Sequence, residues 1–115
     1  MSRRSSAAAV KLSDAAPLFA ALGDTTRLKL VTRLCIEGPL SIARLSEGTD
    51  VTRQAITKHL LALADAGVVN DNRMGRERIW ELQPERLQTA RLCLDQISAQ
   101  WDAALERLRA FVEED

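Results

Sequence analysis

The chain has 115 residues, which is enough for one domain with a single modest core. Hydrophobic residues make up 46% of it and charged residues 28%, as in an ordinary globular protein. Its 16 basic and 16 acidic side chains cancel, so an argument for nucleic-acid binding needs a local cluster of cations. Residues 1–12 show no helical pattern and predict a flexible N-terminal arm, followed by one folded domain over residues 13–113.

Two helices are expected at the start of this domain. Apolar residues recur at spacings of three and four from residue 13 to 22, and again from 25 to about 37. Gly23 ends the first helix, and Asp24 is a suitable N-cap for the second. The apolar face of the second helix is predicted to contain Leu28, Val31, Leu34 and Cys35.

Two further helices joined by a short turn follow. Gly38-Pro39 breaks the second helix, and Ser41 caps a short third helix that ends at Gly48. Thr52 caps a fourth helix over about 52–66. Two helices in this arrangement predict a helix-turn-helix. The buried side of the fourth helix is expected to consist of Ile56, Leu60 and Leu63.

After residue 67 the pattern changes from helical to alternating. A β-hairpin is predicted over about 68–82, with its turn at Met74-Gly75. Pro84 then opens a last helix over about 84–112, because proline fits the first helical position. The chain is therefore predicted to be mainly α-helical with a small β-hairpin wing, in the order α-α-α-α-β-β-α.

The fourth helix has a polar face that suits a DNA major groove. With Ile56 at the centre of the buried side, steps of 100° place Gln54 and Lys58 nearly opposite, with Arg53 and Thr57 on one flank. Arginine pairs well with guanine and glutamine with adenine. A polar helix face is more often only solvated, and it is the adjoining turn and helix that favour DNA contact. The predicted DNA contacts of this helix are Thr52, Arg53, Gln54, Thr57, Lys58 and His59, the last as a packing or phosphate-contacting residue.

The hairpin concentrates three cations, Arg73, Arg76 and Arg78, directly after this helix. They are predicted to contact the DNA backbone or the minor groove. The alternative is a charged strand edge that discourages pairing with other strands.

The last helix carries an unbroken apolar seam at alternating steps of three and four, from Leu87 to Phe111. A core this small is not expected to cover the whole seam, so we predict pairing with a second copy of the chain. The alternative is packing within one chain. The predicted dimerisation residues are Leu18, Phe19, Leu94, Ile97, Trp101 and Leu108.

Four segments together resemble the ArsR-type, or arsenic-repressor-like, winged helix-turn-helix transcriptional regulators. The segments are LFAALGDTTRL (18–28), QAITKHL (54–60), LADAGVV (63–69) and GRERIWEL (75–82). The resemblance covers roughly residues 15–112. It implies a homodimeric repressor that binds a pseudo-palindromic operator in double-stranded DNA and leaves it when an effector binds.

The chain departs from the metal-sensing members of that family, whose third helix carries cysteines. The matching residues 40–45 contain no thiol, and the only histidine of the chain is His59. The resemblance is therefore to a subgroup without the metal-binding motif, and neither a metal nor a cofactor is expected. Relatives that sense oxidants pair cysteines of the matching helices, so a thiol-redox-responsive repressor using Cys35 and Cys93 is an alternative. A buried free cysteine, however, usually acts as a small hydrophobe.

Two other functional classes compete with DNA binding. A winged-helix module that binds only proteins is the competing class, and it would not depend on the cations of the fourth helix and hairpin. An enzyme is not expected, because the chain has one histidine, no Cys/His pair at nucleophile spacing and no glycine-rich phosphate loop. No stretch approaches the ~20 apolar residues of a membrane helix, and a cytoplasmic location is expected.

Overall fold

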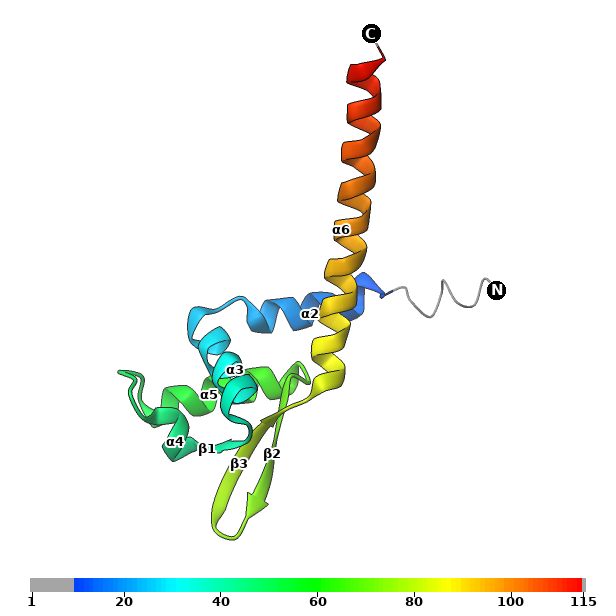
Figure 1. Cartoon of the computed structure of the whole chain (residues 1–115). Coiled ribbons are helices and arrows are strands. Elements are labelled where there is room, and N and C mark those ends of the chain that lie inside the picture. Colours follow the sequence, from blue (N-terminus) through cyan, green and yellow to red (C-terminus); the bar gives the residue numbers. More distant parts are fainter. Residues whose placement is uncertain (1–9, 115) are drawn as a thin grey trace.

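The structure is a computed structural model that describes residues 10–114, so residues 1–9 of the predicted arm lie outside it. The elements along the chain (Figure 1) are α2 (Leu12–Leu22), α3 (Thr25–Glu37), β1 (Leu40–Ser41), α4 (Ile42–Ser46), α5 (Arg53–Asp65), β2 (Val69–Met74), β3 (Glu77–Leu82) and α6 (Pro84–Glu113). The predicted mainly helical winged helix-turn-helix is confirmed.

Three side-chain caps set the starts of the central helices. Asp24 accepts a hydrogen bond from the backbone N–H of Arg27 at 3.0 Å and begins α3. Ser41 caps α4 and Thr52 caps α5 in the same way. Each cap satisfies a backbone donor that the first helical turn leaves free.

The sheet has one strand more than the sequence predicted. Its order is β1-β3-β2, with both pairs antiparallel, and β1 pairs Leu40 with Trp80. Two residues are too few to show the alternation of a strand, so β1 has no sequence signal. The hairpin turn lies at Gly75-Arg76, one residue later than predicted, because Met74 pairs with Glu77.

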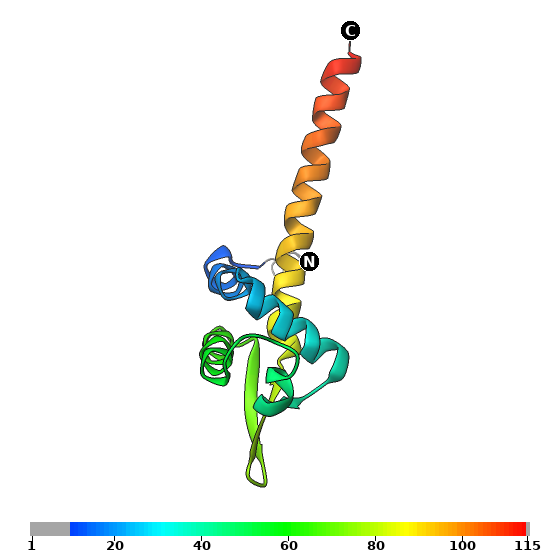
Figure 2. The ribbon, with the colours of Figure 1, turned by 90° about the vertical axis from the view of Figure 1, so that its left-hand side faces the viewer.

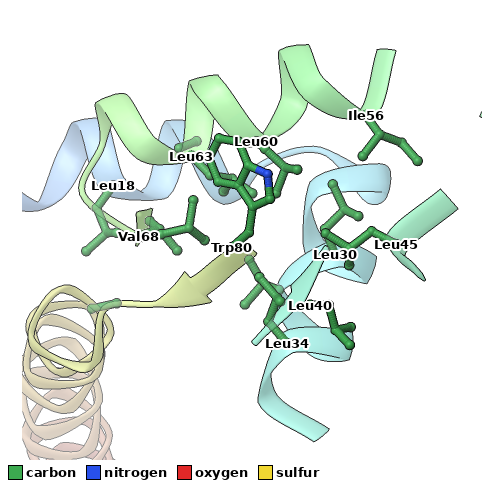
Figure 3. Packing of buried hydrophobic residues seen from close by; sticks show 14 residues of the cluster. Leu18, Leu30, Leu34, Leu40, Leu45, Ile56, Leu60, Leu63, Val68 and Trp80 are labelled. Carbon is green, nitrogen blue, oxygen red and sulfur yellow. The ribbon is translucent and has the colours of Figure 1, made fainter. Parts of the chain in front are cut away.

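The core gathers around Trp80, which lies under α5 beside Leu60 and Leu63 (Figure 3). Leu18 of α2 and Val68, just before β2, complete one side of it. Ile56, Leu60 and Leu63 are all buried, as predicted for the fourth helix. Helix α5 is therefore held against a continuous apolar layer along its inner side.

The apolar face of α3 differs from the prediction. Leu30 is buried with Val31 and Leu34, whereas Leu28 is 49% exposed and Cys35 is exposed. Leu28 and Leu30 lie 200° apart around a helix, so spacing alone could not tell which of them faces inward. The sheet and α5 cover the Leu30 side.

Helix α6 leaves the body of the molecule after its first turns (Figures 1 and 2). It packs on α2 and buries Ala90 and Cys93. The radius of gyration is 18.9 Å, compared with about 13 Å for a compact chain of this length. Over residues 10–114 no helix is both long and apolar enough to span a membrane.

Candidate nucleic-acid interface

The outward face of α5 presents three of the predicted contact residues together. Arg53, Gln54 and Lys58 are exposed, with Gln54 and Lys58 nearly opposite buried Ile56 and Arg53 on the flank. Thr57 is half-buried, and its hydroxyl donates a hydrogen bond to the carbonyl of Arg53 at 2.9 Å. Its oxygen can still accept from a neighbouring donor. The predicted helix face is therefore assembled, with Thr57 at its border.

His59 lies off this face, in a polar cluster at the turn between α2 and α3. Its Nδ1 is 3.3 Å from Nη1 of Arg27 and 3.8 Å from Oδ2 of Asp24. Arg27 also donates from Nε to the carbonyl of Ala21 at 2.6 Å. The hydrogen bond from the Arg27 N–H, together with the nearby charges of His59 and Arg27, holds the pKa of Asp24 below its usual value. His59 thus ties α5 to the α2–α3 turn.

The two faces of the hairpin have different chemistry. The register places Asp71, Arg73, Arg78 and Trp80 on the face that continues into the core. The opposite face carries Asn72, Met74, Glu77, Ile79 and Glu81. The wing is therefore cationic on one side, and acidic and partly apolar on the other.

Arg78 is held in place on the cationic face. Its Nε donates to Oδ2 of Asp71 at 2.6 Å, and its guanidinium carbon lies 5.0 Å from the ring centroid of Trp80. This geometry fits a cation–π contact. The hydrogen bond and charge of Arg78 hold the pKa of Asp71 below its usual value. Arg73 pairs with Arg78 across the ladder, so two like charges face each other there, with Asp71 as the anion beside them.

Helix α5 and the β2–β3 hairpin approach each other beside α4. Arg53 at the start of α5 and Arg78 of β3 line one shallow depression of about 180 Å³. Arg76 is exposed at the hairpin turn. Sequence patterns gave no sign that Arg53 and Arg78 converge, because the relation depends on how the hairpin folds back on α4. The depression is lined by Ser41, Ile42, Ala43, Arg53, Glu77 and Arg78.

The two cysteines occupy unlike environments. Cys93 lies on the buried side of α6, but Cys35 is exposed, so the prediction that Cys35 belongs to the apolar face of its helix is wrong. Within residues 10–114 no group of three or more histidine, cysteine or acidic side chains could hold a metal ion.

Helix α6 displays a row of exposed apolar side chains that includes four predicted dimerisation residues. Trp101 is 62% exposed, and Leu94, Ile97 and Leu108 are also exposed. Phe19 is half-buried, whereas Leu18 has no exposed surface and packs in the core of its own chain. The assignment of Leu18 to the dimer surface is therefore wrong. Further apolar residues that the predicted seam did not include are also exposed: Leu105 and Val112 of α6, and Leu12 at the start of α2.

Known proteins resemble this chain in sequence and in fold. The sequence profile of a helix-turn-helix domain family matches residues 22–72. An HTH-type transcriptional regulator of Mycobacterium tuberculosis is 38% identical over 85 residues, covering 74% of this chain and 76% of the relative. An arsenical resistance operon repressor of Escherichia coli is 30% identical over 95 residues, covering 83% and 79%.

A solved structure gives the same result for the fold. The ArsR-like transcriptional regulator from Rhodococcus sp. RHA1 superposes with a TM-score of 0.73 and 34% identity, covering 86% of this chain and 92% of that one. These relatives are transcriptional regulators and not enzymes. The chain therefore belongs to the ArsR family of winged helix-turn-helix transcriptional regulators.

Proposed function

We propose that the protein is a homodimeric repressor that binds a pseudo-palindromic operator. Helix α5 enters the major groove, and the cationic face of the β2–β3 wing lies on the adjacent backbone or in the minor groove. The observation that carries this proposal is the convergence of Arg53 and Arg78 on one depression beside α4. A groove-reading helix and a backbone-contacting hairpin must lie side by side in this way to follow one stretch of duplex.

The chemistry of α5 suits base recognition. Arg53 and Gln54 at its start can each make two parallel hydrogen bonds to a purine in the major groove. Lys58 lies one turn further along the same face, where an ammonium can meet either a base edge or a phosphate. The free N–H groups at the start of the helix favour a nearby phosphate as well.

The chemistry of the wing suits the phosphate backbone. Arg73 and Arg78 face each other on one side of the hairpin, and a phosphate between them would relieve their repulsion. Asp71 and the ring of Trp80 already fix the guanidinium of Arg78, so little side-chain freedom is lost when it binds. Arg76 at the turn extends the cationic edge.

A second copy of the chain explains the exposed side of α6. Leu94, Ile97, Trp101 and Leu108 repeat at coiled-coil spacing along a helix whose outer turns leave the body of the chain. Pairing two such helices buries this surface from water. It also supplies two copies of α5, which a palindrome with half-sites ~34–36 Å apart requires.

The direct test is binding of the purified protein to DNA from upstream of its own gene at two salt concentrations. We expect Arg53→Ala to weaken specific binding by about 1–3 kcal/mol, as for loss of a bidentate base contact. Lys58→Ala should lower the salt slope by about one unit if Lys58 contacts a phosphate. Arg109→Ala removes the same charge from α6, where the side chain pairs with Glu106 and Glu113, and serves as the control.

The same binding measurements also distinguish a sequence-specific DNA-binding protein from a module that binds only proteins. Equal affinity for the upstream segment and for random duplex would overturn the proposal. Loss of binding in the Arg109 variant equal to that in the Arg53 variant would show that only net charge matters.

A further inference from the structure

We propose that Arg86 fixes the angle between the recognition helix α5 and the dimerisation helix α6, and thereby the half-site spacing that the dimer accepts. This inference rests on the proposed function. It makes Arg86 a positioning residue, which acts on DNA only through α5.

The side chain of Arg86 joins three helices at one point. It belongs to the first turn of α6, and its Nε donates to the carbonyl of Ala66, the C-cap of α5, at 3.1 Å. Its Nη2 donates to the carbonyl of Asp14 in α2 at 3.2 Å. A planar guanidinium holds its donors in fixed directions, so the two bonds restrict both distance and angle. Its positive charge also lies where the dipole of α5 favours a cation.

The turn that ends α5 is in close contact with the stem of Arg86. Gly67 has a φ of +80°, and a Cβ there would lie 3.0 Å from Cγ of Arg86. The turn is also internally fixed, because Gly67 and Val68 donate to the carbonyls of Ala64 and Leu63, each at 2.9 Å. Arg86 therefore holds a rigid end of the recognition helix and not a loose loop.

A small rotation of α5 about its Ala66 end displaces its Arg53 end by a large distance. The 13 residues of α5 span about 20 Å, so a rotation of roughly 10° about its Ala66 end moves its Arg53 end by about 3.5 Å. This is close to the ~3.4 Å rise of one base pair. Because α6 carries the dimer seam, the α5–α6 angle determines where the two recognition helices sit relative to each other.

The first measurement does not depend on DNA. Residual dipolar couplings of backbone amides in the full-length protein give the orientation of α5 relative to α6 and its fluctuation. Arg86→Met keeps the aliphatic stem but removes the charge and all donors, and Arg86→Lys keeps the charge but not the planar fork. Leu40→Val, a mild change in β1 within the core, is the control for a general loss of stability.

In the wild type and in Leu40→Val, we expect α5 and α6 to share one alignment tensor. In Arg86→Met, α5 should show a reduced or rotated tensor, with Arg86→Lys in between. A single shared tensor in Arg86→Met, unchanged from the wild type, would overturn the inference. If Arg86→Met does not fold, the same comparison is made with Arg86→Lys.

The second measurement uses operators whose half-sites are moved apart or together by one base pair, which also rotates them by about 34–36°. We expect the wild type to prefer its best spacing by about tenfold and Arg86→Met to prefer it by less than about threefold. An unchanged preference would contradict the inference, whatever the total affinity. A wild type that binds no DNA specifically would instead refute the proposed function, and the dipolar couplings would still decide the role of Arg86.

Discussion

At the scale of single residues, Asp71 has two opposing effects on the cationic face of the wing. Its carboxylate orders Arg78 through a 2.6 Å hydrogen bond, and it also places a negative charge beside the two arginines that are proposed to meet phosphates. An arginine held in this way is pre-oriented, but part of its charge is already neutralised. Asp71 should therefore limit affinity for DNA of any sequence.

We expect Asp71→Asn to strengthen binding to random duplex by roughly threefold to tenfold at low salt, because a repulsive charge is removed while an acceptor for Arg78 remains. Fluorescence anisotropy measures this directly. Glu81→Gln removes the same charge from the opposite face of the hairpin, where Glu81 accepts a hydrogen bond from Asn72. Equal gains in the two variants would mean that the wing does not present one particular face to DNA.

Gly67 is a second residue where the structure makes a sharp prediction. Both Gly67 and Gly48 have positive φ, but only Gly67 lies against a side chain, that of Arg86. We expect Gly48→Ala to cost about 1–2 kcal/mol of unfolding free energy from backbone strain, partly offset by a less flexible unfolded chain. Gly67→Ala should cost more, since it also displaces the Arg86 stem. Urea unfolding measures both variants. Equal losses of unfolding free energy in the two would show that the contact between Gly67 and Arg86 leaves room for a Cβ.

The pH dependence of stability follows from the carboxylates whose pKa values are lowered. Hydrogen bonds from the Arg27 N–H, from Arg33 and from Arg78 are the main causes at Asp24, Glu37 and Asp71. A lowered folded-state pKa adds stability above the unfolded pKa, and that stability is lost as pH falls through the folded value. With reference values of 3.8 for Asp and 4.5 for Glu, the loss belongs below about pH 4.5.

Asp24→Asn tests this, because asparagine also caps helices but does not titrate in this range. We expect the variant to be less stable than the wild type near neutral pH, and the difference to shrink as pH falls below about 4. Urea midpoints at pH 7, 4.5 and 3 give the comparison. A difference that is constant over this range would contradict the assigned cause.

At the scale of elements, the sequence predicts what local chemistry controls. Asp24, Ser41 and Thr52 cap their helices as expected, because each cap needs only a side chain and the backbone a few residues on. The outward face of α5 follows from helical geometry once buried Ile56 is placed. These features need no knowledge of the rest of the fold.

Features that depend on how the elements meet were not predictable. The turn at Gly75-Arg76 lies one residue beyond the expected position, which shifts the pairing of the two strands by two residues, so Arg73 faces Arg78 and Arg76 lies in the turn. Which arginines face each other on the wing therefore appears only in the folded hairpin. The same holds for Leu28 and Leu30, whose burial is decided by which side of α3 the sheet covers.

At the scale of the whole molecule, the exposed apolar side of α6 is the surface that we propose pairs with a second copy of the chain. The outer turns of α6 carry exposed Trp101, Leu105, Leu108 and Phe111, a larger apolar surface than isolated exposed residues would give. We expect Trp101→Glu to shift the protein toward monomer by at least tenfold in dissociation constant and to weaken operator binding with it. Sedimentation velocity measures the first effect and anisotropy the second.

The control for this change lies two residues further along the same helix. Ala103→Glu adds the same charge at an exposed position 200° around α6 from Trp101. It should leave the dimer intact. If both variants dissociate equally, or neither does, the seam centred on Trp101 is not the dimer interface.

The most direct test of the whole account is a hydroxyl-radical footprint of the wild-type protein on DNA from upstream of its own gene. A dimer that places two copies of α5 in successive major grooves should protect two patches on one side of the duplex, about 10–10.5 base pairs apart, flanked by weaker protection from the wings. Protection that is absent, uniform along the DNA or confined to one patch would contradict the account.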